Sequence, residues 1–460
     1  MRRLLAAEAR RGRLLLAAVL SYLVLAAPPG CSPDEIPRGP NIVLISADTL
    51  RADHLGCYGY DRSTSPNIDR LASAATLYRK CFSTSPWTVP SHASMFTGKL
   101  PFEHGAHSID PPHPMGDVYP LGLDNLTLAE ALQEEGYRTG AFVSNWAYMF
   151  PQLQLNQGFD TYHLDGVYAD QLNLPIFQWL DQRDKRPFFL FINYIDTHRP
   201  YNVRPRPGLL DAPPVQDRGE LLDQLIAEVL PATGPVPEDL ARKVIDQYDT
   251  SISNLDEQLG KLLDKLEETG VLDNTIIVFT SDHGEYFGEH HLVEHSKDIY
   301  QEAIWVPLIV RKPGQTAGEV VDELASSTDI PALIDSLFEG ERAVRFRRYF
   351  PDEPGRHPVV AQNYYTRPKD LYNKQYGHRF WRVRSAVFEW PFKLIRSSDG
   401  NHELFDLEQD PREANNLYLT NQEMAKKLER RLGQVERTRK HYKFTGAPNQ
   451  QYSEEQLRRM

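Results

Sequence analysis

The stretch Asn41-Ile42-Val43-Leu44-Ile45-Ser46-Ala47-Asp48 decides the fold of this chain, because it is a continuous apolar run that ends in a carboxylate. Three further apolar runs have the same form: Arg138–Val143, Phe188–Tyr194 and Thr275–Thr280. Runs without alternation suit strands that are buried on both faces, as in parallel sheets. Helical patterns alternate with them, so the sequence predicts an α/β domain over residues 40–340, with a large, mainly parallel sheet flanked by helices.

Polar side chains follow these predicted strands at the point where each strand ends. Asp48 follows the first run, His198 the third, and Asp282 and His283 the fourth. Open α/β sheets bind ligands beyond the carboxyl ends of their strands. Any one of these residues could merely cap a helix, but four together at one edge indicate a functional site.

The rest of the chain predicts a long helix and a second, smaller unit. Apolar residues three and four apart indicate a helix from about Pro237 to Glu268. The Pro-rich segment between Pro200 and Pro237 reads either as a loop that shapes the substrate site or as a linker. After residue 340, we expect an α+β subdomain over 341–440 with an antiparallel sheet, followed by a polar tail over 441–460. Its expected strands are His357–Asn363, Trp381–Glu389, Phe392–Arg396 and Glu403–Leu407, and its helix carries Met424, Leu428, Leu432 and Val435 on one face.

The first 30 residues have the form of an export signal. Five Arg precede an apolar run from Leu14 to Ala27, which is short for a membrane span of roughly 20 residues. Gly30-Cys31-Ser32 then predicts a lipid anchor at Cys31 and a periplasmic or outer-membrane lipoprotein of a bacterium; a retained anchor or ordinary cleavage is the alternative. Cys57 and Cys81 remain, either as thiols or as one bridge. The formal charge of -12 argues against a nucleic-acid partner.

Several ordered motifs resemble those of the sulfatase family in the alkaline phosphatase superfamily. Thr88-Val89-Pro90-Ser91-His92-Ala93-Ser94-Met95-Phe96-Thr97-Gly98 is similar to its active-site signature, and the loops beginning at Asp48 and Asp282 are similar to its two metal loops. The segments Thr64–Asp69, Thr197–Tyr201 and Glu403–Leu407 also resemble family motifs. The resemblance implies an alkaline phosphatase-like fold and an enzyme that hydrolyses ester bonds. In that family the signature opens with a Cys or Ser that becomes formylglycine, whereas this chain has Thr88.

The metal-ligand set predicted from these motifs is Asp48, Thr88, Asp282 and His283, around one divalent metal ion. Typical sulfatases carry a second Asp in the first loop and Asp-Asn in the second, an oxygen-rich set that suits Ca²⁺. Here Thr49 and His283 stand at those positions. Fewer carboxylates plus an imidazole favour Mn²⁺ or Zn²⁺, with Ca²⁺ still possible.

The catalytic residues implied by the resemblance are Thr88, His198, Lys297 and His92. Thr88 would be the nucleophile, activated by the metal and by a helix that we expect to begin with Ser91 as its N-cap. His198 would be the general acid. Lys297 would contact the sulfate, or would be a solvated surface residue.

Other positions depart from the family pattern. His92 replaces the usual Arg of the signature, and Ser144-Asn145-Trp146 replaces the customary Lys-x-His. The anion-binding site must therefore differ from the typical one. His290, His291 and His295 could form a second metal cluster, although a solvated His-rich loop explains them as well.

Together these observations predict an exported, metal-dependent hydrolase that cleaves a sulfate or phosphate ester of a small molecule, glycan or lipid headgroup. A sulfated Thr has no elimination route and must be hydrolysed at sulfur, so an unmodified Thr88 favours phosphoryl chemistry. The alternatives are a phosphotransferase similar to phosphoethanolamine and glycerolphosphate transferases, and a degenerate family member that binds anionic glycans.

Overall fold

The computed structural model describes residues 39–108, 118–182, 184–201, 219–338, 347–350, 355 and 358–442. The predicted signal segment, Cys31 and the polar tail beyond residue 442 lie outside the described residues. From Arg38 onward the chain forms one compact unit. No helix among the described residues combines the length and the apolar character that a membrane span requires. Cys57 and Cys81 are both free thiols, so they form no bridge with each other.

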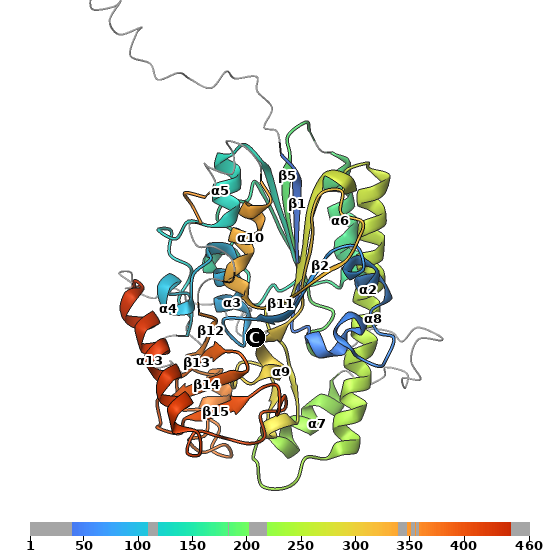
Figure 1. Ribbon diagram of the computed structural model, residues 1–460. Helices are drawn as coiled ribbons and strands as arrows, with labels where there is room; N and C mark the ends of the chain where they lie inside the picture. The colour runs from blue at the N-terminus through green and yellow to red at the C-terminus, as the bar shows by residue number, and fades with distance from the viewer. Residues whose placement is uncertain are drawn as a thin grey trace, which may run out of the picture. The chain divides into compact units, whose positions relative to one another are not determined.

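A nine-stranded sheet forms the centre of the molecule (Figure 1). Its order is β11-β2-β10-β6-β1-β5-β3-β4, and β9 pairs with β2. All pairs are parallel except those made by β10 and β9, which confirms the mainly parallel sheet. The strands are β1 Asn41–Ala47, β2 Thr76–Phe82, β3 Arg138–Val143, β4 Thr161–Leu164, β5 Phe188–Tyr194, β6 Thr275–Thr280, β9 Trp305–Val306, β10 Leu308–Arg311 and β11 Glu319–Ser326.

Strand β1 lies between β5 and β6, and its register aligns the carboxyl ends of all three strands. Ser46 is paired with Asn193 of β5 and with Thr280 of β6. The loops that follow these strands therefore start at the same level, which brings distant sequence segments to one edge of the sheet.

Both faces of the sheet are covered by helices, which explains the unbroken apolar runs. Val43 and Ile45 face one core with the apolar residues of α6 and α8, whereas Ile42 and Leu44 face a second core with those of α3, α5 and α10. In Figure 1 these two groups of helices lie on opposite sides of the sheet. The helices are α2 Pro66–Ala72, α3 Thr88–Thr97, α4 Pro101–His104, α5 Leu128–Glu134, α6 Ala169–Asp181, α7 Glu220–Val229, α8 Glu238–Glu268, α9 Gln301–Ile304, α10 Ile330–Ser336, α12 Pro368–Leu371 and α13 Gln422–Thr438.

The long helix α8 confirms the prediction from apolar spacing, since its apolar positions are buried along its whole length. For the Pro-rich segment the sequence predicted a loop or a linker, and it did not predict a helix there. It contains α7, whose Leu222, Leu225 and Val229 are buried in the core that also holds α8. Residues 202–218 of the segment lie outside the described residues.

The C-terminal unit is a four-stranded antiparallel sheet covered by α13, as predicted. Its strands run in the order β12 Val360–Asn363, β13 Arg384–Glu389, β14 Phe392–Ser397 and β15 Glu403–Asp406. Leu428 and Leu432 of α13 share a core with Leu100 and Phe102, which belong to the first half of the chain. A short hairpin of β7 Tyr286–Phe287 and β8 Val293–Glu294 lies between β6 and β9 in sequence.

Candidate active site

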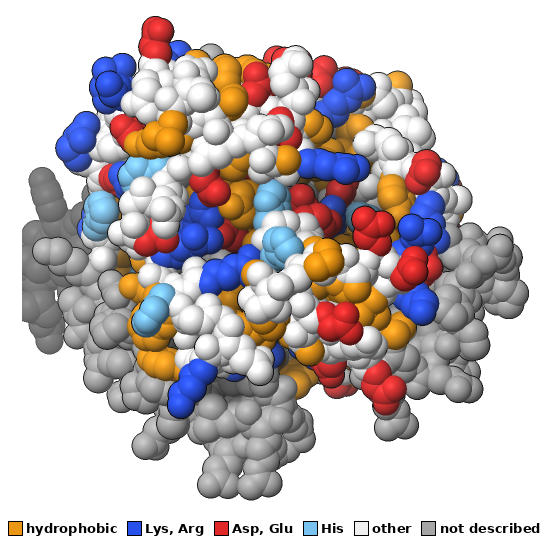
Figure 2. Space-filling model, turned by 90° about the horizontal axis from the view of Figure 1, so that it is seen from below, with side chains coloured by type: hydrophobic (Ala, Val, Ile, Leu, Met, Phe, Trp, Pro, Cys, Tyr) orange, Lys and Arg blue, Asp and Glu red, His pale blue; other side chains and the backbone are white. Residues whose placement is uncertain are grey.

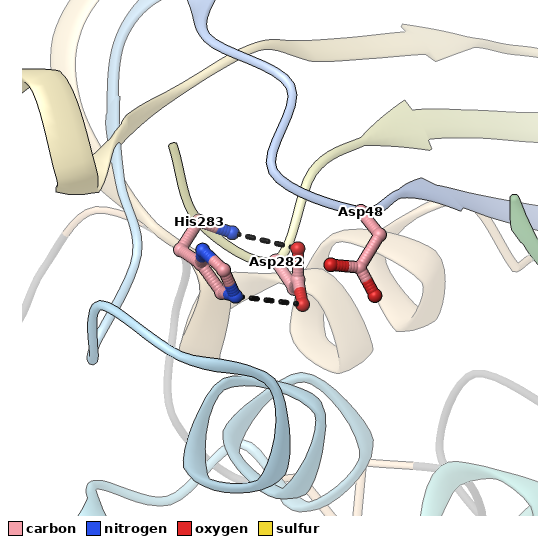
Figure 3. A group of neighbouring side chains, drawn as sticks. All are labelled: Asp48, Asp282 and His283. Atoms are coloured by element: carbon pink, nitrogen blue, oxygen red, sulfur yellow. Dashed lines mark hydrogen bonds and ion pairs between the residues drawn. The ribbon is translucent and has the colours of Figure 1, made fainter. Parts of the chain in front are cut away.

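Three predicted metal ligands meet beyond the carboxyl ends of β1 and β6. Asp48 comes from the loop after β1, and Asp282 and His283 come from the loop after β6. One ligand atom from each lies within 4.8 Å of the others, and all three residues are buried. Figure 3 shows the Asp48 and Asp282 carboxylates side by side, with the His283 ring against Asp282. Among the described residues this is the one group of three or more side chains that could hold a metal ion.

In each of the three side chains, one polar atom forms a hydrogen bond and the other has no hydrogen-bond partner; we call the second kind of atom bare. Asp282 Oδ1 accepts hydrogen bonds from the backbone N–H groups of Thr49 (3.1 Å) and His283 (2.9 Å). His283 donates from Nδ1 to the Gly284 carbonyl oxygen, 2.9 Å away. Asp48 Oδ1, Asp282 Oδ2 and His283 Nε2 are buried and have no hydrogen-bond partner.

These bare atoms are what a divalent cation requires. A buried acceptor without a partner costs about 1–3 kcal/mol, and native proteins tolerate few of them. The His283 tautomer fixed by Gly284 leaves the Nε2 lone pair facing Asp282 Oδ2 at 3.3 Å, an acceptor against an acceptor. Two carboxylates and an imidazole nitrogen form a suitable donor set for a divalent transition metal. The residues present therefore fit the metal that the sequence predicts.

The electrostatics of the site agree with this arrangement. Burial, and then the charge of Asp48, raise the pKa of Asp282 well above its usual value. Burial lowers the pKa of His283 to about 4, so its imidazole is neutral near pH 7. A cation at this position would stabilise both carboxylates in their charged form.

Thr49 stands where typical sulfatases carry a second Asp, and its hydroxyl is used in a hydrogen bond to the backbone. Its hydroxyl donates to the Thr197 carbonyl oxygen, and the Thr197 hydroxyl donates to the Asp48 carbonyl oxygen. This exchange locks the loop after β1 to the loop that carries His198. Thr49 has a φ of 62°, which is strained for a β-branched residue. Such strain persists where the surroundings dictate the conformation, as at functional sites.

Thr88 lies at the start of helix α3, and here one prediction was wrong. The helix begins at Thr88, with Trp87 as its N-cap residue, so Ser91 is not the N-cap. Ser91 instead donates its hydroxyl hydrogen bond to the Ser85 carbonyl oxygen, 2.7 Å away. The short polar signature gave no apolar periodicity that could locate the first turn. Thr88 is thus in the first turn of α3, where the helix dipole favours negative charge.

His92 is buried and helps to hold helix α3 in place. Its Nδ1 donates to the Thr88 carbonyl oxygen at 2.9 Å, and its Nε2 accepts from the Ser46 hydroxyl at 3.0 Å. Burial lowers the pKa of His92, so the ring is neutral. These contacts make His92 a positioning residue that ties the first turn of α3 to the end of β1.

Asn145 is a site residue that sequence reasoning missed. Its Nδ2 donates to Asp48 Oδ2 at 2.7 Å and to the Thr88 hydroxyl oxygen at 3.3 Å. The amide thus bridges a predicted ligand and the predicted nucleophile. Its position just after β3 was a usable signal, but the departure from Lys-x-His directed attention to what was absent.

His198 and His295 extend the site on the side of His283. His198 donates from Nδ1 to the Arg199 carbonyl oxygen at 2.9 Å, which leaves Nε2 for a substrate. The ring of His295 lies 5.2 Å from that of His198 and 4.6 Å from that of His283. His295 is buried and within hydrogen-bonding distance of Glu285 at 3.0 Å. The solvated-loop interpretation was therefore wrong for His295, and His290 lies elsewhere, stacked on Tyr300.

Lys297 is buried, so the interpretation as a solvated surface residue was wrong. Its Nζ lies 3.1 Å from Glu294, 3.4 Å from Asp370 and 3.4 Å from the His295 carbonyl oxygen. Asp370 belongs to the C-terminal unit, which therefore contributes directly to the surroundings of the site.

Comparison with known proteins gives one family. The sulfatase family model matches residues 40–340. The ulvan-active sulfatase of Formosa agariphila is 25% identical over 426 residues, which cover 83% of this chain and 77% of that protein. The N-acetylglucosamine-6-O-sulfatase of Bacteroides thetaiotaomicron is 24% identical over 515 residues and covers 89% and 88%.

Solved structures of the same fold cover nearly the whole chain. The phosphonate monoester hydrolase of Agrobacterium radiobacter superposes with a TM-score of 0.66 at 22% identity, over 86% of this chain and 95% of that one. A protein solved with its substrate D-glucosamine-2-N,6-O-disulfate gives a TM-score of 0.63 at 21% identity, over 87% and 97%. The match over residues 40–340 and the shared fold show that this chain belongs to the sulfatase family, and that it is a hydrolase of ester bonds.

Proposed function

We propose that this protein is a metal-dependent hydrolase that cleaves a sulfate or phosphate ester with unmodified Thr88 as its nucleophile. One observation carries the proposal: three bare ligand atoms of Asp48, Asp282 and His283 converge beside a buried Thr88 hydroxyl. Asn145 connects the two by donating to both Asp48 and Thr88. A site used only for binding would need no hydroxyl at this position.

In the proposed reaction, Thr88 first displaces the leaving alcohol, and water then displaces Thr88. Thr88 loses its hydroxyl proton to solvent, and its oxygen forms a bond to the sulfur or phosphorus of the ester. The bond to the leaving alcohol breaks, and the alcohol takes the Nε2 proton of His198, which enters this step as the imidazolium and leaves it as the neutral ring. Water then attacks the same sulfur or phosphorus atom, the bond to Thr88 breaks, and the proton of the water returns to His198. Thr88 regains a proton from solvent.

Several groups stabilise the charge that develops on the Thr88 oxygen. The Asn145 amide donates to it, and the first turn of α3 directs a positive partial charge toward it. A bound metal would lower the pKa of the hydroxyl and offset the charge of the ester oxygens. Asp48, Asp282, His283 and Thr88 would hold it, and we propose Mn²⁺ or Zn²⁺ because the set contains only two carboxylates and one imidazole.

The test is an activity screen of the full-length protein, stripped of metal and reloaded with Mn²⁺, Zn²⁺ or Ca²⁺. Substrates are an aryl sulfate, an aryl phosphate monoester and a phosphate diester. We expect activity with at least one ester and only in the presence of a metal. Activity without metal would refute the proposed site, and hydrolysis of the aryl sulfate alone would refute the phosphoryl preference.

Variants of Thr88 separate the nucleophile from a merely structural residue. Thr88→Val keeps the branched shape but removes the hydroxyl, so it should abolish turnover. Thr88→Ser keeps the hydroxyl and should retain part of it. Mass spectrometry of the quenched wild-type reaction should find one sulfo or phosphoryl group on the peptide that contains Thr88. Turnover by Thr88→Val would exclude Thr88 as the nucleophile.

We further propose that the protein is exported and held by a lipid at Cys31. The support is the sequence alone: a basic N-terminal region, an apolar run of 14 residues, and Gly30-Cys31. Labelling of cells with a radioactive fatty acid should mark the wild type but not Cys31→Ser. An unlabelled wild type would refute the anchor.

A further inference from the structure

Residues 295–303, which follow the β7–β8 hairpin, contact both the segment before Thr88 and the loop of His283. We name these residues the bridging segment. The Ser296 N–H donates to the Pro86 carbonyl oxygen at 2.8 Å, two residues before Thr88. The His295 ring lies 4.6 Å from that of His283. Figure 2 shows Lys and Arg side chains gathered beside His side chains on the face seen from below.

The end of the bridging segment packs closely against the loop after β6. The Gly284 N–H donates to the Ala303 carbonyl oxygen at 2.8 Å. The next N–H, that of Glu285, donates to the Glu302 carbonyl oxygen at 3.1 Å. A Cβ atom on Gly284 would lie 2.0 Å from this Glu302 oxygen, so only glycine permits the approach. Because Gly284 directly follows His283, a shift of the bridging segment would also shift the loop that carries His283.

The C-terminal unit also contacts the bridging segment, residue by residue. Six consecutive residues, 296–301, each form a hydrogen bond or ion pair with a different residue of that unit. The partners, in the same order, are Asn363, Asp370, Arg384, Lys393, Glu403 and Glu413. Each of the four strands β12 to β15 supplies one of them. The position of the bridging segment therefore depends on the C-terminal sheet.

Arg384 of β13 forms the most extensive of these contacts. It is 1% exposed, and its Nη1 lies 2.8 and 2.7 Å from the two carboxylate oxygens of the buried Asp298. Its Nη2 pairs with Glu403. Burial alone would raise the pKa of Asp298, but the charges of Arg384 and then Arg382 hold it below its usual value. Hydrogen bonds between charged groups are about twice as strong as neutral ones, so Arg384 fixes Asp298 firmly.

Lys297, the residue before Asp298, is fully engaged within the protein. Its ammonium has three N–H groups, and three acceptors lie 3.1–3.4 Å from its nitrogen, in Glu294, Asp370 and the His295 carbonyl group. Burial alone would raise the pKa of Glu294, but three cations hold it well below its usual value: Arg367, Lys297 and Arg199. We therefore expect the bridging segment to affect the rate of the reaction rather than the binding of the ester.

From these contacts we infer that Arg384 is a positioning residue for catalysis. Through Asp298 it holds the bridging segment, and with it the loops of Thr88 and His283, in the arrangement that hydrolysis requires. The inference rests on the proposed hydrolase function. Displacement of a reacting group by about 1 Å costs about a hundredfold in rate. The C-terminal sheet thus contributes to turnover, although Arg384 acts on the site through Asp298.

The test compares Arg384→Met and Arg384→Lys with the wild type, on the ester that the activity screen identifies and at a temperature where calorimetry shows each protein folded. The Met variant removes the guanidinium, so kcat should fall about tenfold to hundredfold while KM stays within about threefold. The Lys variant keeps the charge but replaces a planar fork of donors by one ammonium, so its kcat should be intermediate. Arg396→Met is the matched control. Arg396 lies on the neighbouring strand β14 and pairs with Glu436 of α13, so its loss should lower Tm and leave kcat unchanged.

Amide hydrogen exchange, followed by mass spectrometry, gives a second measurement that needs no turnover. We expect residues 295–303 to exchange about tenfold faster in Arg384→Met than in the wild type, because the segment opens more often once its anchor is removed. Residues of β1 should exchange as in the wild type. Arg396→Met should leave residues 295–303 as protected as they are in the wild type.

The outcomes separate this inference from the proposed function. A wild-type kcat in Arg384→Met, a rise in KM alone, or an equal loss of kcat in Arg396→Met would overturn the positioning role. If the wild type hydrolyses no ester, the proposed function fails on its own, and hydrogen exchange then decides the inference: faster exchange of residues 295–303 supports it, and unchanged exchange refutes it. If Arg384→Met does not fold, Arg384→Lys and Asp298→Asn carry the same test.

Discussion

Replacing Asp282 by Asn should make the metal-free protein more stable and the metal-loaded protein less so. The variant keeps an acceptor for the N–H groups of Thr49 and His283, because the side-chain oxygen can take the place of Oδ1. Its amide then faces the bare Nε2 of His283, where the wild type has an oxygen at 3.3 Å. At a pH above the raised pKa of Asp282, where its carboxylate is ionised, an acceptor–acceptor contact becomes a hydrogen bond, and the repulsion with Asp48 disappears.

The expected gain follows from the cost of a bare buried acceptor, about 1–3 kcal/mol. With an unfolding entropy of ~2.1 cal/mol/K per residue and about 400 residues in the unit that begins at Arg38, 1 kcal/mol changes Tm by ~1.2 °C. The metal-free variant should therefore melt about 1–4 °C above the metal-free wild type. A metal at a hundred times its Kd should stabilise the wild type by about 2.7 kcal/mol, or ~3 °C, and the variant scarcely at all.

Scanning calorimetry in a chelator and in Mn²⁺ measures both effects. Asp249→Asn serves as a control, since Asp249 is also buried but has donors in His54 and Tyr60, each at 2.7 Å. It should lower Tm in both conditions and leave the response to metal intact. A metal-free Asp282→Asn protein that melts below the wild type and still responds to Mn²⁺ would refute the reasoning.

Three further outcomes are expected. Asn145→Ala removes the hydrogen bond to Asp48 and should lower metal affinity or kcat by about 10–100-fold; metal titration and steady-state kinetics measure this, and unchanged values would contradict the bridging role. Glu294→Gln leaves buried cations unpaired and should lower the free energy of unfolding by about 3–5 kcal/mol in urea titrations, whereas Asp322→Asn, at an exposed ion pair with Arg79, should change it by less than about 1 kcal/mol. Because the pKa of Glu294 is held low in the folded state, its stabilisation is present above about pH 4.5 and is lost as pH falls through the folded-state pKa. Glu294→Gln should flatten that acid slope, and an equally steep slope would show that other carboxylates cause it.

The sequence predicted where the site lies in the fold, because the carboxyl ends of neighbouring parallel strands lie at one edge of the sheet. Asp48, Asp282 and His283 could be assigned to one place from the apolar runs before them, and the structure brings them within ligand distance. Nothing in that argument needed a side-chain conformation. The fold class was equally accessible, since both faces of β1 are buried and its sequence shows no alternation.

The contacts that the sequence missed depend on conformations that no pattern encodes. His295 is buried, and its neighbours Glu294 and Ser296 adopt positive φ angles of 61° and 65°, which are rare for residues other than Gly. Lys297 is buried and pairs with Asp370, which lies 73 positions later in the chain. Hydropathy predicts both residues to be on the surface, and only the tertiary structure reverses this.

The position of β1 between β5 and β6 has a consequence for how the chain reaches its native state. Strand β1, the first strand in the described part of the chain, pairs with residues 147 and 234 positions later. Of the described strands, neither partner therefore exists until residue 188 has been synthesised, and the pairing is complete only at residue 280. Contacts of such long range make folding slow, and they leave an apolar segment exposed on the growing chain. We therefore expect production of this protein to depend on molecular chaperones more strongly than its final stability would suggest.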